Sequence, residues 1–442
     1  MKHLTYIILI SIVFFTSCTK DTADNTLDTE LRQALINEGQ SLDYFKLPSS
    51  SNYTQIPQDP KNPITSEKVA LGQLLFHETV FATAGEFPIT TFTYSCASCH
   101  HAGAGFQSGI AQGVGEGGEG FGIRGEERVR NTLCEPSLCD VQPIRTPTVL
   151  NGAFQPLMLW NGQFGATSLN EGTEELWTAD TPKEKNHLGF EGLETQAIAG
   201  LGVHRLEINE EAVTANNYKD LFDNAFSDLP EEERYSLITA GLAIAAYERT
   251  VMANEAPFQK YLNGNTRALS DEQKEGAILF FGKAGCVSCH TGPALNKMEF
   301  HALGMNEFNP AEVIHYNVDD PAQLGRFTFT GKEADKYLFK TPQLYNLKRL
   351  EFLGHGASFH SIREVIEYKN DAVAENSNVP SSVLSDEFVP LGLTDEEVDK
   401  ITDFIANGLF DPNLDRYVPT SLPSGLCFPN NDEVSQEDLG CN

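Results

Sequence analysis

The chain has 442 residues, enough for two or three domains, and its 40% hydrophobic and 21% charged residues are typical of a globular protein. A formal net charge of −31 argues against electrostatic binding to nucleic acid or to an anionic membrane surface. The charge serves solubility first, and it also suits the steering of a basic partner such as a small electron-carrier protein.

The N-terminus has the pattern of an export segment. Lys2 and His3 precede an apolar run at residues 4–15, which is too short to cross a bilayer comfortably. Cys18 follows two small residues, as in a bacterial lipoprotein cleavage site, and this favours a lipidated Cys18 over an ordinary signal peptide cut nearby. We therefore expect an exported protein, periplasmic or lipid-anchored in the cell envelope.

Two similar helices punctuate the chain. After a tether at residues 19–56, with a short helix near residues 27–36, a helix is predicted from Thr65 or Ser66 to Phe76. A second helix begins at Ser270, which forms a capping box with Gln273. Both helices carry the pattern Gly-x-x-Leu-Phe, which indicates an internal duplication: Gly72, Leu75 and Phe76 in the first, Gly276, Leu279 and Phe280 in the second.

Each of these helices is followed by the motif Cys-x-x-Cys-His. In c-type haem proteins the two thiols add to the vinyl groups of one porphyrin, and the histidine binds the iron. A single zinc ion held by both cysteine pairs is the alternative, but the histidine after each pair and the export segment favour two haems. The residues are Cys96, Cys99 and His100 in the first motif, and Cys286, Cys289 and His290 in the second.

Each haem needs a further helix to bury it. Residues 235–251 are the candidate for the first haem and residues 395–407 for the second, where Thr394 and Glu397 form a capping box. We expect a mainly α-helical fold of two cytochrome-c-like haem domains, with long loops and little β structure. The expected divisions are an export segment at 1–18, the tether at 19–56, haem domains at 57–262 and 263–411, and a tail at 412–442.

Four cysteines remain. Two disulfides, Cys134–Cys139 and Cys427–Cys441, are the simplest of the three possible connectivities, and the second would staple the tail to the surface. A glycine-rich loop lies between Gly103 and Gly125. It lacks the strand–loop–helix context of a phosphate site, so we expect a flexible lid or loop over the first haem.

The order of these motifs resembles that of the bacterial di-haem cytochrome c peroxidases and their MauG-like relatives. The resemblance extends from about residue 57 to residue 409. It includes Leu71-Gly72-x-x-Leu75-Phe76, residues 145–151, Trp160-Asn161-Gly162, residues 245–250, residues 339–346 and Gly354-His355-Gly356.

The resemblance implies reduction of hydrogen peroxide at the N-terminal haem. Electrons would enter at the C-terminal haem from a small cytochrome c or a cupredoxin, and a homodimer would be common. One alternative is a MauG-like enzyme that uses peroxide to oxidise residues of a partner protein. The other is a di-haem electron carrier without enzymatic activity.

The resemblance also implies roles for single residues. Trp160 matches the tryptophan between the haems, although most buried tryptophans only pack. Gln196 matches the distal glutamine of the peroxidatic haem. The position of the family's catalytic glutamate falls on Leu206, so the acid–base group is either Glu207 or His204, and either could instead be an ordinary loop residue.

The first haem departs from the family pattern. Most members have a histidine in the glycine-rich loop that binds this iron until reduction displaces it, and Glu116 stands at that position here. No histidine lies between residues 102 and 150, and His101 is poorly placed to reach the other face. We expect a five-coordinate or water-bound haem that reacts without prior reduction, as in MauG-like proteins.

The second haem departs further. Its distal ligand is methionine in the peroxidases and tyrosine in MauG, and the matching position here is Lys369, with Tyr368 beside it. A neutral lysine amine binds iron, and loss of methionine lowers the haem potential. The outside candidates are Met298, His301 and Met305.

The family's calcium between the haems is also in doubt. Arg145 stands at the position of its asparagine ligand, and a guanidinium cannot coordinate a cation. We expect Arg145 to replace the charge of the ion, with the haem propionates as its partners.

Overall fold

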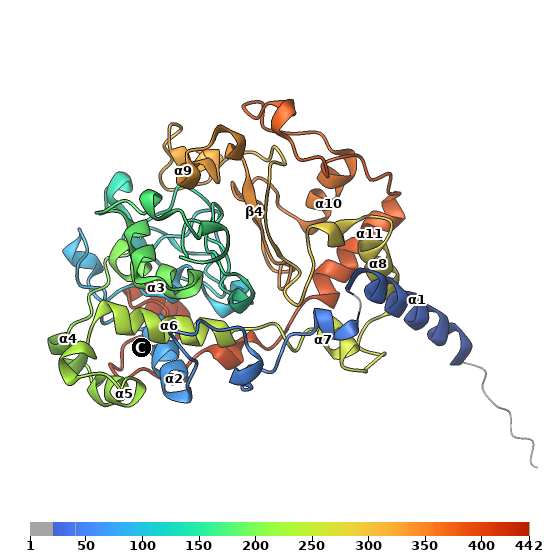
Figure 1. The fold of residues 1–442 in the computed structure, drawn as a ribbon. Coiled ribbons are helices and arrows are strands. Elements are labelled where there is room, and N and C mark those ends of the chain that lie inside the picture. The colour runs from blue at the N-terminus through green and yellow to red at the C-terminus, as the bar shows by residue number, and fades with distance from the viewer. Residues whose placement is uncertain (1–20, 40, 442) are drawn as a thin grey trace, which may run out of the picture.

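The structure is a computed structural model that describes residues 21–39 and 41–441, with the backbone alone for residues 21–25. The predicted export segment and Cys18 lie outside the described residues. The described part of the chain is mostly helical, with long loops and two small antiparallel sheets of two strands each (Figure 1). The expected mainly α-helical fold class is therefore confirmed.

The elements follow one another in chain order. The helices are α1 (Asp21–Gly39), α2 (Ser66–His77), α3 (Gly192–Val203), α4 (Glu210–Ala215), α5 (Lys219–Ala225), α6 (Leu237–Thr250), α7 (Pro257–Leu262), α8 (Asp271–Phe281), α9 (Phe327–Thr330), α10 (Ile362–Asp371), α11 (Asp395–Asp403) and α12 (Glu433–Leu439). The strands are β1 (Gly118–Glu119), β2 (Val129–Arg130), β3 (Lys297–His301) and β4 (Phe339–Thr341).

Helices α2, α3 and α6 pack together as the first helical group (Figure 1). Helix α2 begins at Ser66, within the predicted start at Thr65 or Ser66, and Thr65 caps it by accepting a hydrogen bond from the amide of Lys68. Gly72 allows α2 to approach α6 closely, because a Cβ atom there would lie 1.9 Å from the carbonyl oxygen of Ala243. Residues 78–95 connect α2 to the first haem motif.

Helices α8, α11 and α1 form the second helical group at the other end of the molecule (Figure 1). The predicted capping boxes at the starts of α8 and α11 are both present. Gly276 has the role that Gly72 has in the first group, since a Cβ atom there would lie 2.0 Å from the carbonyl oxygen of Lys400. The duplication therefore extends from the sequence pattern to the contact between the helices.

Helix α1 is longer than the short helix expected near residues 27–36. It packs on α8, where Asp28 forms a 3.0 Å ion pair with Lys274, whose side chain is only 4% exposed. The sequence pattern of this segment is too polar to reveal a docked helix, because its stability comes from contacts with a helix some 240 positions later in the chain.

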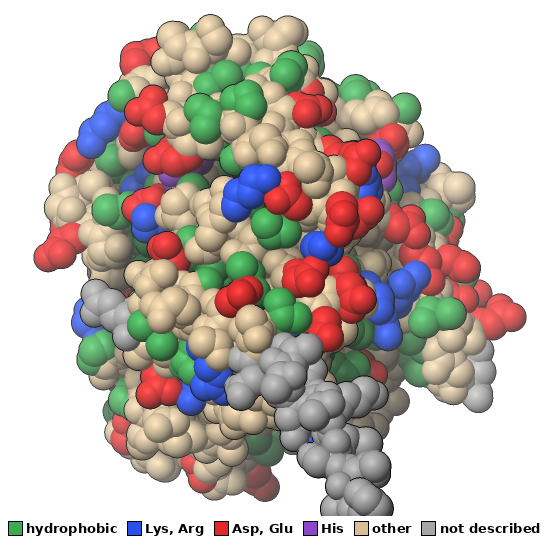
Figure 2. All heavy atoms as spheres, turned by 90° about the vertical axis from the view of Figure 1, so that its right-hand side faces the viewer, with side chains coloured by type: hydrophobic (Ala, Val, Ile, Leu, Met, Phe, Trp, Pro, Cys, Tyr) green, Lys and Arg blue, Asp and Glu red, His purple; other side chains and the backbone are tan. Residues whose placement is uncertain are grey.

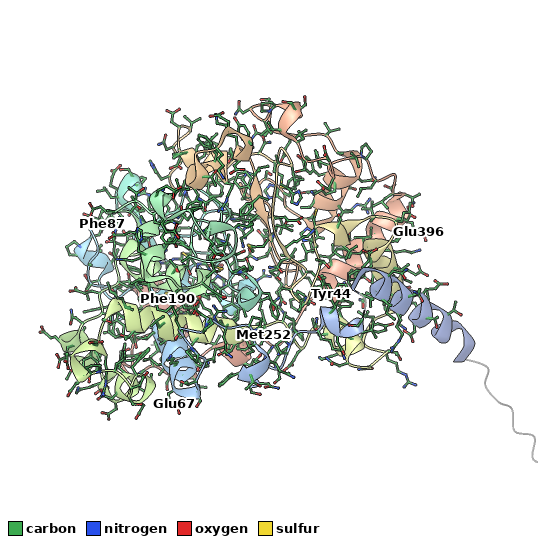
Figure 3. All side chains as sticks on the ribbon, in the orientation of Figure 1. Tyr44, Glu67, Phe87, Phe190, Met252 and Glu396 are labelled. Carbon is green, nitrogen blue, oxygen red and sulfur yellow. A yellow bond between two sulfur atoms is a disulfide. The ribbon has the colours of Figure 1, made fainter. Side chains whose placement is uncertain are left out.

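The C-terminal tail leaves the second helical group and returns to the first, where Figure 1 marks the C-terminus near α2. Met252, labelled in Figure 3, is buried where the tail crosses the link between α6 and α7. Its amide donates to the hydroxyl of Tyr417, which donates in turn to the Met252 carbonyl oxygen at 2.8 Å. The tail is therefore part of the packed structure.

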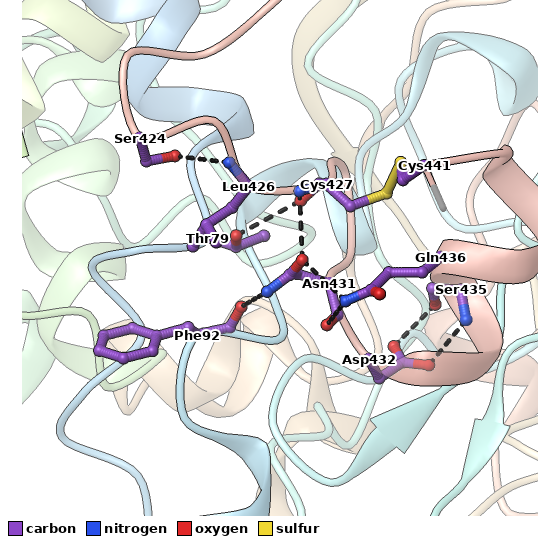
Figure 4. The surroundings of a disulfide bond; sticks show 10 residues. All are labelled: Thr79, Phe92, Ser424, Leu426, Cys427, Asn431, Asp432, Ser435, Gln436 and Cys441. Carbon is purple, nitrogen blue, oxygen red and sulfur yellow. Dashed lines mark hydrogen bonds between the residues drawn. A yellow bond between two sulfur atoms is a disulfide. The ribbon is translucent and has the colours of Figure 1, made fainter.

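The two predicted disulfides have different outcomes. Cys427–Cys441 is present and joins the two ends of the last tail segment (Figure 4). The predicted Cys134–Cys139 bond is wrong for this structure, in which both are free, buried thiols. The thiol of Cys139 lies 3.4 Å from the carbonyl oxygen of Glu135.

Candidate active site

The first Cys-x-x-Cys-His motif orients its histidine through the backbone. Nδ1 of His100 lies 3.3 Å from the carbonyl oxygen of Phe106. A carbonyl only accepts, so Nδ1 carries the hydrogen and Nε2 is left as the lone-pair nitrogen for a metal. Burial lowers the pKa of His100 to about 4, which keeps the ring neutral.

The second motif repeats this arrangement. Nδ1 of His290 lies 3.2 Å from the carbonyl oxygen of Leu295 and 3.1 Å from that of Pro342, so Nε2 is again the free nitrogen. Burial lowers the pKa of His290 to about 4 as well. Both histidines are thus prepared as neutral iron ligands with fixed orientation.

A cavity of about 290 Å³ opens beside the second motif and is lined by Cys286, Cys289 and His290. It also contacts two buried basic side chains, Arg145 and Lys340, and burial lowers their pKa values to about 10 and about 7. A buried cation without an anion is unfavourable. A haem bound here would bring two thiol-reactive vinyl groups, an iron for His290 and two propionates for these cations, so the residues fit this group.

The structure separates the two candidate distal residues of the second haem. Lys369 lines the cavity, forms no ion pair among the described residues, and has its amine 5.5 Å from the ring centre of Phe388. Burial lowers the pKa of Lys369 to about 8. Tyr368 does not line the cavity, and its hydroxyl donates to the carbonyl oxygen of Leu303 at 2.5 Å.

The outside candidates also differ in position. His301 and Met305 line the cavity, whereas Met298 on β3 does not. The ring of His301 already has neighbours, because Nδ1 lies 3.3 Å from the hydroxyl of Ser385 and Nε2 lies 3.8 Å from Sγ of Cys289. Of the two nitrogen candidates on the cavity wall, Lys369 has fewer competing partners than His301.

On the first haem, helix α3 brings Gln196 and His204 into one row. A Cβ atom on Gly200 would lie 3.3 Å from Nε2 of Gln196 and 3.8 Å from Cδ2 of His204, so the three residues follow one another along one helix face. Oε1 of Gln196 is buried without a partner among the described residues. The glycine-rich loop connects this row to the first motif. A Cβ atom on Gly113 would lie 3.0 Å from Sγ of Cys99, and one on Gly115 would lie 2.4 Å from Oδ2 of Asp140, the partner of His204.

His204 and Glu207 point in different directions. Nδ1 of His204 lies 3.0 and 2.8 Å from the two carboxylate oxygens of Asp140. Glu207 is exposed, and its carboxylate accepts hydrogen bonds from Thr83 and Asn209. The geometry therefore favours His204 over Glu207 as the acid–base group.

The glycine-rich loop is anchored, which differs from the expected flexible lid. Glu116 is fully buried and accepts from the amide of Phe87 at 2.8 Å, from Thr90 at 3.0 Å and from the guanidinium of Arg205. The tail holds the same loop, because the carboxylate of Asp438 accepts from the amides at its turn. Residues 111–118 are all buried, and Glu116 fixes this part of the loop.

His101 packs against this loop and does not reach toward the opposite haem face. Its ring centre lies 5.0 Å from that of Phe121, and a Cβ atom on Gly125 would lie 2.2 Å from its Nε2. Both ring nitrogens are buried without partners among the described residues. Burial lowers the pKa of His101 to about 3, so this ring is a neutral packing group.

Trp160 lies on the wall of the cavity, where the first half of the chain meets the second. Its indole N–H donates to the carbonyl oxygen of Arg145 at 2.8 Å, and its ring centre lies 6.3 Å from that of His355. The amide of Lys340, on β4, donates to the Trp160 carbonyl oxygen at 2.8 Å. These contacts therefore fix the side chain of Trp160 between the two halves of the chain.

Arg145 binds carbonyl oxygens as a metal ion would. Its guanidinium donates to the carbonyl oxygens of Ile110 at 2.8 Å, Ala111 at 3.3 Å and Ser108 at 3.0 Å. Burial lowers its pKa to about 10, so it stays charged near neutral pH. Among the described residues, no group of three or more His, Cys, Asp or Glu side chains is arranged to hold a metal ion.

Sequence reasoning missed two residues of these sites. Asp140 lies 64 positions before His204, and only the folded loop brings them together. Lys340 lies within the segment that carries the family resemblance, but its burial beside Gln155 becomes evident only in three dimensions. A charged residue inside an otherwise apolar motif was the available signal for Lys340, and Asp140 offered none.

Comparisons with known proteins identify the family of the chain. Residues 66–267 match the family described as di-haem cytochrome c peroxidase. The chain is 30% identical over 325 residues to the methylamine utilization protein MauG of Methylorubrum extorquens, covering 73% of each chain. It is also 30% identical over 339 residues to the cytochrome-c peroxidase IdrP1 of a Pseudomonas species, covering 71% of this chain and 74% of the relative.

Among solved structures, the fold is similar to that of a MauG-like protein associated with microbial copper homeostasis. The TM-score is 0.59 at 22% identity, covering 83% of this chain and 95% of the other. Because the identity is low, this likeness concerns the fold alone. Taken with the sequence relatives and the two haem motifs, the chain belongs to the di-haem cytochrome c peroxidase and MauG family and is an oxidoreductase that carries two c-type haems.

Proposed function

We propose that this peroxide-using enzyme reduces hydrogen peroxide to water at the haem held by His100. The haem held by His290 receives electrons from a small cytochrome c or cupredoxin, and the two haem domains comprise residues 57–262 and 263–411. The observation that carries this proposal is the row formed by Gln196, Gly200 and His204 on α3. In this row an amide and an imidazole flank Gly200, and the loop that holds Asp140 against His204 also passes Cys99 of the first motif.

The side chains in this row have separate roles. Bound to His100, the haem supplies an iron that binds peroxide and passes electrons to it. His204 takes a proton from one peroxide oxygen and returns it to the other. Gln196 holds the substrate through its unpartnered amide oxygen. Two electrons and two protons then convert one peroxide into two water molecules.

The test uses a matched pair of glycines on α3. Gly200→Leu places a side chain between Gln196 and His204, whereas Gly202 faces open space, so Gly202→Leu is the control. We expect donor-supported peroxide consumption to fall at least about tenfold in the first variant, because the acid–base group is blocked. Equal activities, with intact haem spectra in both variants, would contradict this placement.

We further propose that Lys369 is the distal ligand of the second haem, and Tyr368 is not. Support comes from the cavity position of Lys369 and from the hydroxyl of Tyr368 being engaged with Leu303. Lys369→Met should restore a thioether ligand and raise the haem potential, with matching changes in the ferric absorption and EPR spectra. Tyr368→Phe is the control and should leave both spectra unchanged; the reverse result would assign the ligand to Tyr368.

The second candidate function is MauG-like oxidation of residues on a partner protein. Two features favour it: Glu116 stands where most relatives have a loop histidine, and Lys369 stands where the peroxidases have methionine. The ferric protein, mixed with one equivalent of peroxide and no donor, distinguishes the functions. Rapid return to the ferric spectrum favours peroxide reduction, a persistent oxidised state favours protein oxidation, and no response leaves a plain electron carrier.

The bridging role matched to Trp160 is also a proposal. Its fixed position on the cavity wall supports electron transfer between the haems. Trp160→Phe keeps an aromatic ring but removes the indole N–H. We expect slower transfer from the second haem to the first, measured by stopped-flow absorption, with unchanged peroxide binding. An unchanged transfer rate would reduce Trp160 to a packing residue.

The surface supports a basic electron donor. Figure 2 shows many acidic side chains, interrupted by lysines and arginines, on the end of the molecule that carries α1. Asp395, Glu396 and Asp399 on α11 have side chains that are 68–96% exposed. We expect the rate with a basic cytochrome c to fall as salt rises. A rate independent of salt would exclude charge steering, and homodimer formation is a separate proposal for sedimentation analysis.

The remaining proposals concern location and calcium. None of the described helices is long and apolar enough to cross a membrane. We propose export and lipid attachment at Cys18, which mass spectrometry of the mature N-terminus tests. We also propose that Arg145 supplies the positive charge between the haems without calcium. One tightly bound calcium per chain in metal analysis would overturn this.

A further inference from the structure

We propose that Asp140 is the positioning residue for His204, and that these two side chains form the proton-transfer pair beside the haem of His100. The inference rests on the proposed function, because it names how the acid–base group of the same site is held in place. It goes beyond it by assigning a role to a carboxylate that no sequence motif indicates.

The contact between the two side chains fixes the orientation of the imidazole. Both carboxylate oxygens of Asp140 lie within 3.0 Å of Nδ1 of His204. A carboxylate only accepts, so Nδ1 carries the hydrogen and Nε2 becomes the nitrogen that exchanges protons. The side chain of Asp140 is 6% exposed and that of His204 is 36% exposed, so the carboxylate is buried behind a ring that remains accessible.

The glycine-rich loop delivers Asp140 to this place. The amide of Gly115 donates to the carbonyl oxygen of Asp140, and the amide of Asp140 donates to that of Glu116, both at 3.0 Å. Gly115 must lack a side chain, because a Cβ atom there would lie 2.4 Å from Oδ2 of Asp140. The loop therefore sets the position of the carboxylate through its backbone and through the absence of one Cβ atom.

Three charged or titratable groups face His204 from the surrounding elements. Burial lowers the pKa of His204, but the charge and hydrogen bond of Asp140 raise it by more, against the opposing guanidinium of Arg205. The third group is His100, whose pKa the charge of His204 lowers. Arg205 forms its ion pair with Glu116, whereas Asp140 pairs with His204.

The pair moves one proton without net consumption of either group. Nε2 of His204 accepts a proton from one peroxide oxygen, and the imidazolium that results is balanced by the carboxylate of Asp140. Nε2 then gives the proton to the other oxygen as the O–O bond breaks. Asp140 stays ionised throughout, so its contribution is orientation and charge.

Three variants and one control of the holoprotein test this role. Asp140→Asn keeps the shape and removes the charge, Gly115→Ala displaces an intact Asp140, and His204→Gln removes the proton carrier. Asp223→Asn is the control, since Asp223 is ion-paired with Arg234 on the α5 side of the molecule, with no contact to the site. The measurements are peroxide turnover against pH and the ferric spectra of both haems.

We expect His204→Gln to reduce turnover by about 10²-fold or more, and both loop variants to reduce it at least about tenfold. Asp140→Asn should also move the acid limb of the pH profile to lower pH, because the group that raises the pKa of His204 is gone. Both ferric spectra should remain those of the wild type, and Asp223→Asn should match the wild type throughout.

Two results would overturn the positioning role. In the first, Asp140→Asn and Gly115→Ala keep the wild-type rate and pH profile while His204→Gln loses activity. In the second, the loop variants lose haem or change its spectrum, which marks Asp140 as a structural residue. A wild-type protein that does not consume peroxide would instead refute the proposed function, so the two failures are distinguishable.

Discussion

The two haem units are built alike but held differently. In each, a glycine on the helix before the motif packs so closely against a carbonyl oxygen of the closing helix that a Cβ atom has no room. Gly72 of α2 packs against α6, and Gly276 of α8 packs against α11. The first unit is then wrapped by the glycine-rich loop and the tail. The second keeps a cavity of about 290 Å³ with Lys369 on its wall. Shared packing thus supports two different iron environments.

The difference indicates how a duplicated unit acquires two roles. At the first unit, Glu116 fixes the glycine-rich loop, and the loop backbone holds Asp140 against His204, the pair that we propose for proton transfer. At the second, the surroundings contribute buried cations, which suit a haem that passes electrons and binds no substrate. Changes at matched positions in the two units therefore give the sharpest tests.

The largest expected effects come from the two cysteine pairs. Cys96→Ala with Cys99→Ala, and Cys286→Ala with Cys289→Ala, should each leave one covalent haem per chain in a pyridine haemochrome assay. Loss of the first pair should reduce peroxide consumption to background. Loss of the second should abolish only donor-supported turnover and preserve a single reaction with peroxide. The same phenotype in both variants would mean that the two haems do not divide these roles.

Next in size are the two glycine contacts. Gly72→Ala and Gly276→Ala each force apart two packed helices, and overpacking of this kind costs about 1–3 kcal/mol or more of the free energy of unfolding. Gly202→Ala on α3 faces open space and is the control, with a gain of roughly 0.5–1 kcal/mol. Chemical denaturation measures all three. If only one of the two alanine variants lost stability, the two glycine contacts would not be equivalent.

These contacts also show how much the sequence can predict. Local signals were sufficient for the helix caps at Ser270 and Thr394, for the haem motifs and for the repeated glycine pattern. Each of these features depends on residues a few positions apart, so the sequence pattern alone indicates it.

What the sequence could not predict is long-range. The pairing of Asp140 with His204, the anchoring of the loop by Asp438 and the docking of α1 all join distant parts of the chain. The predicted disulfide between Cys134 and Cys139 was wrong for a related reason. Their short spacing suggested a disulfide, but the orientation of each thiol depends on how the surrounding loop folds.

A smaller effect on local stability is expected from removal of the disulfide in the tail. Among the described residues, the second unit has no corresponding disulfide. Cys427→Ser with Cys441→Ser opens a link of sequence separation 14, worth up to about 3 kcal/mol in the chain-entropy account. Asp438 should then bind the loop less firmly. We expect faster hydrogen exchange at Phe121 and Gly122, with α8 unchanged as the internal control. Unchanged exchange at the loop would show that the tail holds without its disulfide.

The smallest expected effect concerns one residue at which the duplicated helices differ. His77 follows Phe76 at the end of α2, and the corresponding residue on α8 is Phe281. His77 is 2% exposed, its Nδ1 lies 2.8 Å from the carbonyl oxygen of Gln73, and burial lowers its pKa from 6.5 to about 4.

The sign of the pH effect follows from this lowered pKa. Above pH 6.5 the ring is neutral in the folded and the unfolded chain, so the pKa shift has no effect on stability. As the pH falls from 6.5 toward 4, only the unfolded chain takes up the proton, and the folded protein loses about 3 kcal/mol. His77→Phe copies the second unit and removes this loss. It should remain within about 1 kcal/mol of the wild type at pH 7, because one hydrogen bond is given up.

Denaturation of both proteins between pH 7 and pH 4 measures the difference, with His360→Phe at an exposed position as the control. The His77 variant should become more stable than the wild type only on the acid side. Parallel curves for the two proteins would mean that the buried ring is protonated in the folded state. The aromatic cluster of His77, Tyr247 and Phe428 would then contain a charged imidazole in the folded protein. The matching cluster around Phe281 consists of phenylalanines and contains no ionisable ring.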